Sequence, residues 1–191
     1  MIDKLLFLDI DGVLTSDQSG TSYHCEDPEA YKPDEECKAN LLRVAAAVPN
    51  LKVVLHSAWT TRVQDDCPCF DYRGKTFYSP LNNVVGWLIE YDLFLGLTDC
   101  TKRDADGKRI SKKEKILEWL QEHSRELDSG CKALVIDDDT VFNDLVTINT
   151  MEPPGIASLR FMPIDKNTGF TQEDAAKAIG YFNGQQGTRQ A

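Results

Sequence analysis

The strongest constraint on this chain is an apolar run that ends in two aspartates and a glycine, Phe7-Leu8-Asp9-Ile10-Asp11-Gly12-Val13-Leu14-Thr15. The continuous apolar segment 5–8 is typical of a strand buried on both faces of a parallel sheet, and Gly12 marks the turn after it. Ligands of open α/β sheets bind at the carboxyl ends of strands, so Asp9 and Asp11 are expected to face the binding crevice. Two adjacent carboxylates repel unless a cation relieves them, and Mg²⁺ is the simplest hard ion with oxygen ligands.

Beyond this motif, apolar strands alternate with amphipathic helices, which predicts an α/β fold with a mostly parallel sheet and helices on both faces. Further strands are expected at 51–55, 93–97, 133–136 and 157–161, and helices at 33–47, 81–91, 111–127 and 171–182. The polar stretch 16–33 is expected to form a flap over the site, and residues 60–80 an irregular loop insert. Residues 1–184 then form one domain, and 185–191 a disordered tail.

Composition narrows the class of protein. A chain of 191 residues is long enough for one domain with a sizeable core. We recognise neither a secretory signal nor a membrane-spanning run, so a cytoplasmic protein without membrane contact is expected, its six cysteines free thiols. The net charge of −10 argues against broad non-specific binding to nucleic acid. Residues 102–115 nevertheless carry seven lysines and arginines, a basic island in an acidic protein.

Polar residues follow three of the expected strands, at the edge where the carboxyl ends of parallel strands meet. These residues are Asp9, Asp11, Ser57, Asp137 and Asp138. We assign Asp137 and Asp138 to the metal because they follow the apolar run directly, which leaves Asp139 as a spare and Asn143 or Asp144 as supporting residues. His56, next to Ser57, is expected to be a structural histidine.

The order and spacing of these motifs over residues 4–145 resemble the haloacid dehalogenase (HAD) superfamily of aspartate-nucleophile phosphotransferases. The resemblance implies a three-layer, Rossmann-like fold with a minimal, C0-type cap formed by the flap and the loop insert. Two further segments, His56-Ser57-Ala58-Trp59 and Asn167-Thr168-Gly169-Phe170-Thr171, resemble a small-cap branch that includes the phosphatase modules of RNA-repair proteins.

In that family pattern, Asp9 is the nucleophile that forms an aspartyl phosphate, and Asp11 is the general acid and base. Ser57 donates a hydrogen bond to the phosphoryl group, while Gly12 and Ala58 belong to the substrate-binding residues. The metal ligands are Asp9, the backbone carbonyl of Asp11, Asp137 and Asp138. Dehalogenases of this kind lack the second aspartate and the ion pumps carry threonine there, so Asp11 favours hydrolysis.

The catalytic lysine is expected at the start of the helix near residue 112. Ser111 and Glu114 form a capping box, which places Lys112 and Lys113 at the first helical positions. Cations there oppose the helix dipole by ~0.3–1 kcal/mol each, unless a bound phosphate compensates. We choose Lys112, four residues before Ile116 as in the superfamily pattern; Lys113 and Arg109 compete with it and are assigned to substrate binding.

Three interpretations follow. The first is a Mg²⁺-dependent phosphomonoester hydrolase whose phosphorylated substrate is a polynucleotide end or a nucleotide. The second is the same enzyme restricted to a small phosphorylated metabolite, and the third is a non-catalytic binding module that kept the fold. The complete set of motif residues favours an enzyme, and the basic island favours the first substrate class. No obligate protein partner is evident from the sequence.

Overall fold

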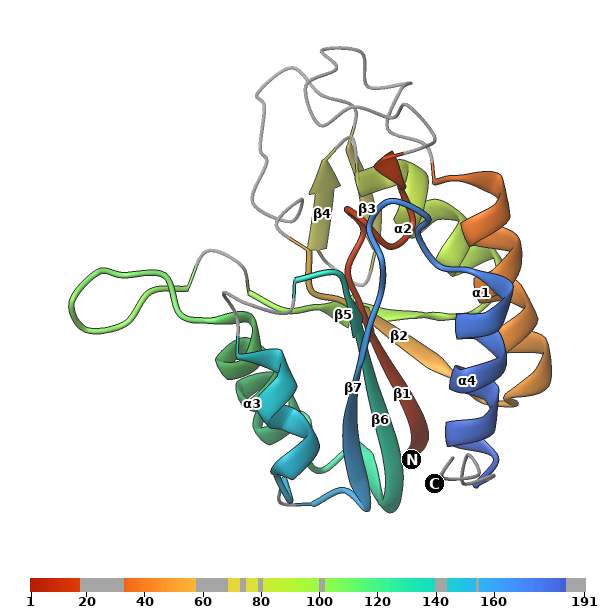
Figure 1. Cartoon of the computed structure of the whole chain (residues 1–191). Coiled ribbons are helices and arrows are strands. Elements are labelled where there is room, and N and C mark those ends of the chain that lie inside the picture. Colours follow the sequence, from red (N-terminus) through yellow and green to blue (C-terminus); the bar gives the residue numbers. More distant parts are fainter. Residues whose placement is uncertain are drawn as a thin grey trace.

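The computed structural model describes residues 1–17, 33–57, 69–72, 75–78, 81–99, 102–139, 144–153 and 155–184. Its centre is a five-stranded sheet in the order β5-β2-β1-β6-β7, in which every neighbouring pair of strands is parallel. The strands are β1 (Ile2–Leu8), β2 (Lys52–Leu55), β5 (Phe94–Leu97), β6 (Leu127–Asp137) and β7 (Ser158–Pro163). The expected parallel α/β fold is confirmed (Figure 1).

Helices cover both faces of the sheet (Figure 1). One face carries α1 (Glu35–Ala47), α2 (Leu81–Glu90) and α4 (Gln172–Phe182), and the other carries α3 (Lys112–Glu122) and the 3-10 helix η4 (Leu145–Thr150). None of the helices within the described residues has both the length and the apolar character needed to cross a membrane. The molecule is therefore a three-layer structure, as expected from the alternating pattern.

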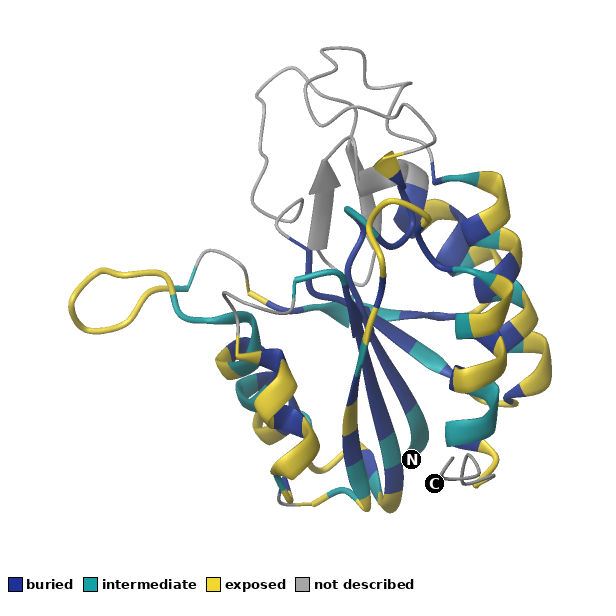
Figure 2. Ribbon diagram, viewed as in Figure 1, coloured by how far each residue is buried: buried dark blue, intermediate teal, exposed yellow. Residues whose placement is uncertain are grey.

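The central strand β1 is divided between two cores, one on each face of the sheet. Leu6 and Leu8 pack among the residues of the α1, α2 and α4 side, whereas Leu5 and Phe7 pack toward α3. All four side chains are fully buried (Figure 2). Because successive side chains of a strand point to opposite faces, a strand covered on both sides needs the continuous apolar run that this sequence has.

The boundary between α3 and β6 differs from the expectation. The helix begins after Ser111 as expected but ends at Glu122, five residues before the expected end at 127, and Leu127 is the first residue of β6. Leu127 follows the helical apolar spacing, but it lies in β6, where it pairs with Ile2 of β1 and is buried in the core on the α3 side. The helical spacing of Leu127 therefore predicts the wrong end for α3, because this residue belongs to the sheet.

The loop insert at 60–80 is also not irregular throughout. It contains an antiparallel hairpin of β3 (Cys69–Tyr72) and β4 (Lys75–Tyr78). Both strands are rich in aromatic residues and are separated only by Arg73 and Gly74, a composition that favours a hairpin. Most of the expected flap at 16–33 and the whole expected tail at 185–191 lie outside the described residues.

Candidate active site at the strand ends

The register of the sheet brings three strand ends to the same level. Leu8 lies level with the last apolar residues of β2 and β6, so that the next residues, Asp9, His56 and Asp137, follow side by side. The Asp9 N–H donates to the Ile136 carbonyl over 3.0 Å, and the His56 N–H donates to the Leu8 carbonyl over 3.1 Å. Hydrogen bonds between neighbouring strands therefore fix the backbone on which the site is built.

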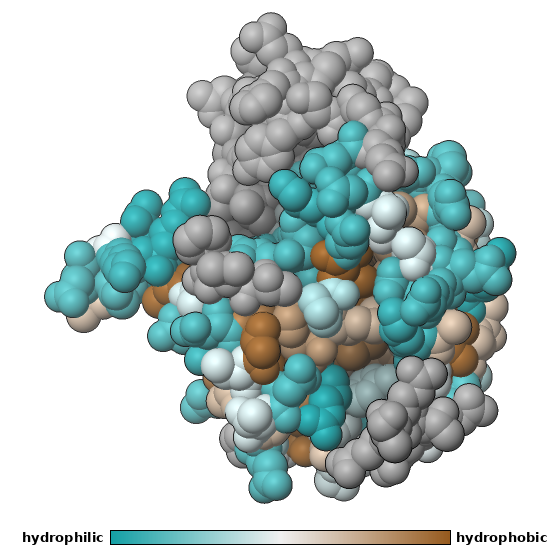
Figure 3. Space-filling model, in the orientation of Figure 1, coloured by the Kyte–Doolittle hydropathy of each residue, from teal (hydrophilic) through white to brown (hydrophobic). Residues whose placement is uncertain are grey.

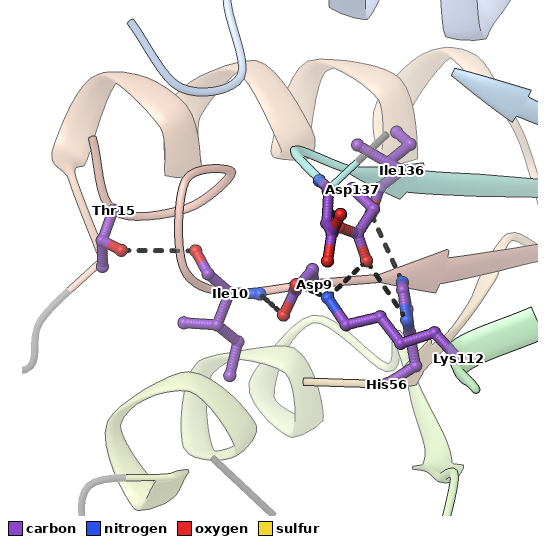
Figure 4. A network of polar contacts seen from close by, with 8 residues as sticks. Asp9, Ile10, Thr15, His56, Lys112, Ile136 and Asp137 are labelled. Atoms are coloured by element: carbon purple, nitrogen blue, oxygen red, sulfur yellow. Dashed lines mark hydrogen bonds and ion pairs between the residues drawn. The ribbon is translucent and has the colours of Figure 1, made fainter. Parts of the chain in front are cut away.

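Lys112 links the carboxyl ends of β1 and β6. Its ammonium group donates to Asp9 Oδ2 and, over 2.7 Å, to Asp137 Oδ2 (Figure 4). The other oxygen of Asp9 accepts the Ile10 N–H over 2.7 Å. Asp9 and Asp137 are 3% and 0% exposed, so this cation neutralises carboxylates that have almost no contact with solvent. Lys112 is the lysine that the structure places at the site.

Helix α3 positions this lysine through its N-terminal cap. The Ser111 side chain accepts from the Glu114 backbone N–H over 3.2 Å, and Glu114 Oε2 accepts from the Ser111 N–H over 2.7 Å. This reciprocal pair is the expected capping box. It fixes the first turn of α3, and Lys112 is the first residue of that turn.

The charges of the site depend on burial and on one another. Burial alone would raise the pKa of Asp9, but the charge of Lys112 and hydrogen bonds from Lys112 and Ile10 hold it below its ordinary value. Burial and the nearby charge of Asp9 raise the pKa of Asp137 to about 8, despite Lys112. Burial would lower the pKa of Lys112, yet the two carboxylates hold it above its ordinary value. Asp9 is therefore ionised and Lys112 charged at neutral pH.

Three carboxylates could hold a metal ion together. One oxygen each of Asp9, Asp137 and Asp138 lies within 4.8 Å of the others. A set of carboxylate oxygens fits Mg²⁺, a hard cation that prefers oxygen ligands. Gly12 packs directly against this group: it has a positive φ of 69°, and a Cβ at this position would lie 2.5 Å from the Asp138 carboxylate. The glycine of the motif is thus required both by the turn and by the space that Asp138 occupies.

Asp11 lies in a tight loop after β1. The Ile10 carbonyl accepts backbone N–H groups of Val13, Leu14 and Thr15 at 2.8–3.2 Å, which closes the loop. Asp11 is half-buried in this loop, where its backbone bridges to Thr15. The three-carboxylate group contains no Asp11 oxygen; the expected ligand from Asp11 was its backbone carbonyl. Its roles as metal ligand and general acid remain predictions.

The end of β2 contributes two buried polar residues. Ser57 is 0% exposed, immediately after His56, and its role as a donor to substrate remains a prediction. His56 Nδ1 lies 3.6 Å from Asp137 Oδ2, and its Nε2 lies 3.4 Å from the Ile136 carbonyl. Burial lowers the pKa of His56 to about 4, so the ring is neutral and packs beneath the carboxylates. In the sequence, only its neighbour Ser57 indicated that His56 lies at the site. Ala58 lies outside the described residues.

The competing cations lie elsewhere. Lys113 donates to Thr147 Oγ1 over 3.2 Å and lies 3.9 Å from Asp144 Oδ2, so it joins α3 to η4. Arg109 is exposed on the loop before α3, where its backbone pairs with that of Arg103. Asp144 therefore pairs with Lys113, while Asn143 lies outside the described residues. Substrate binding by Lys113 and Arg109 remains a prediction.

Comparison with known proteins identifies the family. The model of the HAD domain in Swiss Army Knife RNA repair proteins matches residues 5–175, and the chain belongs to this family. Among solved structures, the HAD domain of the effector protein Lem4 from Legionella pneumophila is similar, with 16% identity, 93% of each chain covered and a TM-score of 0.46. A search of curated proteins gave no match. The resemblance stated from the motifs is confirmed.

Proposed function

We propose that this chain is a Mg²⁺-dependent phosphomonoester hydrolase that acts through an aspartyl phosphate. The observation that carries the proposal is Asp9: a buried, ionised carboxylate held by Lys112 and Ile10, beside two further carboxylates at neighbouring strand ends. Phosphoryl transfer needs mainly alignment and charge stabilisation, which such a fixed cluster can supply. Membership in a family of HAD domains from RNA repair proteins supports the same chemistry.

The two half-reactions use residues of this chain. An Asp9 oxygen forms a bond to phosphorus while the bond from phosphorus to the ester oxygen breaks, and Asp11 gives that oxygen its proton. Asp11 then takes a proton from water, whose oxygen attacks phosphorus and releases Asp9 and inorganic phosphate. Lys112 and Ser57 would balance charge on the phosphoryl oxygens. Mg²⁺, held by Asp9, Asp137, Asp138 and the Asp11 carbonyl, would supply further charge neutralisation.

For the substrate, we propose a polynucleotide end or a nucleotide. The family name links its members to RNA repair, and the basic island of residues 102–115 includes Lys112, the proposed catalytic lysine. A panel of 3′- and 5′-phosphorylated oligonucleotides, nucleotides and sugar phosphates tests this choice. Higher kcat/KM for nucleic-acid ends supports it, preference for sugar phosphates points to a small metabolite, and inertness toward all of them, aryl phosphate included, indicates a non-catalytic module.

The substitution Asp9→Asn tests the nucleophile. We expect release of phosphate from an aryl phosphate in Mg²⁺ to fall by at least ~10³-fold, because an amide oxygen is a poor nucleophile and a weaker metal ligand. Asp139→Asn is the matched control: it makes the same change in the 137–139 run, but our assignment leaves Asp139 outside the ligand set, so activity should persist. Circular dichroism shows whether both variants fold. Retained activity in folded Asp9→Asn would contradict the nucleophile assignment.

A further inference from the structure

The segment between β5 and α3 projects from the body of the protein. We name residues 102–110 the basic arm; in Figure 1 it is the loop that extends away from the sheet beside α3. Residues 103–109 are all exposed (Figure 2), and the face of the arm that is visible in Figure 3 is mostly hydrophilic. Nothing in the proposed hydrolysis of a simple phosphomonoester requires such a projection.

The arm is an ordered hairpin. Arg103 and Arg109 form an antiparallel bridge, and the Asp104 N–H donates to the Lys108 carbonyl over 2.8 Å. At the tip, Asp104 Oδ1 accepts the backbone N–H groups of residues 106 and 108, and Gly107 supplies the positive φ of 77°. The arm can therefore present its side chains at a fixed place without first becoming ordered, which would cost binding free energy.

The charge of the arm is opposite to that of the chain. Its four cations and two carboxylates give a net charge of +2, in a protein whose net charge is −10. Lys102 is paired with Glu118 of α3 at 2.9 Å, which anchors the base of the arm. Asp104 is engaged with the backbone of the tip. The Arg103 guanidinium donates to the Gly107 carbonyl over 2.9 Å, so it helps to close the tip, whereas Lys108 and Arg109 are exposed along the hairpin.

We propose that the basic arm binds the sugar-phosphate backbone of a polynucleotide whose terminal phosphate occupies the Asp9 site. This inference rests on the proposed function and narrows it from any phosphorylated end to a strand several nucleotides long. The arm leads through Ser111 directly to Lys112, so it starts at the site and extends outward. Guanidinium groups match phosphate oxygens in charge and geometry.

The dimensions of the arm set the length of strand it can contact. Four or five extended residues reach roughly 13–16 Å. Each nucleotide of a stacked strand advances about 3.4 Å along the helix axis, so an arm that lies along this axis spans about four phosphates. A mononucleotide bound at Asp9 is too short to extend along the arm. We therefore expect KM to fall as the substrate grows to about four nucleotides and then to level off.

The kinetic test compares phosphorylated oligonucleotides of increasing length, from a mononucleotide to an octanucleotide. In the double variant Lys108→Glu/Arg109→Glu, KM for the octanucleotide should rise roughly tenfold, and the slope of log KM against log salt should fall by ~0.7 for each lost contact. Lys108→Glu alone should leave the rate on an aryl phosphate unchanged. Arg125→Glu, at an exposed residue beyond the far end of α3, is the matched control for Lys108→Glu, because each of these variants changes the net charge by −2.

Binding separates this inference from the proposed function. Fluorescence anisotropy with a labelled octanucleotide and the Asp9→Asn chain measures binding without turnover. If this binding depends on the arm while the unsubstituted chain hydrolyses none of the phosphomonoesters, the proposed function is refuted and the role of the arm is kept. Three results would overturn the proposed role of the arm. These are a KM that does not depend on substrate length, equal effects of Arg125→Glu and Lys108→Glu on KM for the octanucleotide, and an unchanged affinity in the double variant. Equally tight arm-dependent binding of a multiply phosphorylated peptide would overturn its assignment to a polynucleotide.

Discussion

At the scale of single residues, the available space and the local charge determine which side chain each position of the site can hold. Gly12 has no Cβ, and that absence leaves the space in which the Asp138 carboxylate lies. His56 is neutral because burial lowers its pKa to about 4, so it adds no second cation beneath Asp9 and Asp137. Within the described part of the chain, Lys112 is then the cation in direct contact with both carboxylates. Each residue type follows from the space or the charge around it.

Gly12→Ala tests the steric role of the motif glycine. The new Cβ would lie 2.5 Å from Asp138, so this carboxylate must move, and we expect Mg²⁺ affinity and activity to fall about tenfold or more. Isothermal titration calorimetry with Mg²⁺ measures the affinity. The control is Gly155→Ala, where φ is also positive at 85° but no atom of the described residues lies within 4 Å of the new Cβ. Both variants should lose ~1–2 kcal/mol of stability from backbone strain; equal Mg²⁺ affinities would contradict the steric argument.

At the scale of elements, α3 is the helix that supplies the cation of the candidate site. Its first residue supplies the ammonium group of the site, its second contacts η4, and the loop before it is the basic arm. The apolar face of the same helix, with Ile116, Trp119 and Leu120, packs on the sheet. The edge-to-face contact of Trp119 with Phe7 of β1, at 5.5 Å between ring centroids, fixes the helix relative to the strand that carries Asp9.

Two capping boxes make this role testable. Ser111→Ala and Thr171→Ala remove equivalent caps, from α3 and α4 respectively, and each should cost ~1 kcal/mol of stability in denaturant unfolding. Only Ser111→Ala should also reduce kcat, by roughly tenfold, because it loosens the turn that holds Lys112. If the two variants lose activity equally, the reduction reflects stability alone and the positioning role of the cap is refuted.

At the scale of the whole molecule, one sheet joins two cores. Cys37 is buried in the core on the α1 and α4 side, and Cys131 in the core on the α3 side. Both are free thiols, as expected for the cysteines; the side chains of the other four lie outside the described residues. Burial raises the pKa of each thiol to about 11. The two cysteines therefore report separately on the two faces of the same sheet.

Alkylation of these thiols tests whether the faces unfold together. At pH 8 a thiol with a pKa of about 11 is only ~0.1% thiolate, and burial blocks access as well, so neither should react in the native state. In a urea series, pulse alkylation and peptide mass spectrometry should give one midpoint for both. Two separated midpoints in this urea series would show that the two cores unfold independently.

The same thiols predict how stability depends on pH. Because burial raises the folded-state pKa of each thiol above its ordinary value, the free energy of unfolding should decline as pH rises from about 9 toward 11.

Much of the fold could be predicted because its signals are local. The strand at 5–8, the cap at Ser111 and the order of the strands with their acidic ends each depend on a few neighbouring residues. The expected end of α3 at residue 127 was wrong, because Leu127 satisfies the helical spacing but lies in β6. The hairpin at 69–78 was not predicted because its strands contain no run of three consecutive apolar residues, whereas the segments 53–55 and 93–95 each have one.

The sequence by itself determined that a buried strand ends in Asp9, that acidic residues follow another strand, and that a capped helix begins with lysines. Only the tertiary structure decided which lysine reaches the carboxylates and that His56 lies neutral beside them. The physical reason is distance along the chain. A cap or a strand is stabilised by contacts a few residues apart, whereas Lys112 meets Asp9 across 103 residues. Such a contact exists only when the register of the sheet and the packing of α3 against it are both in place.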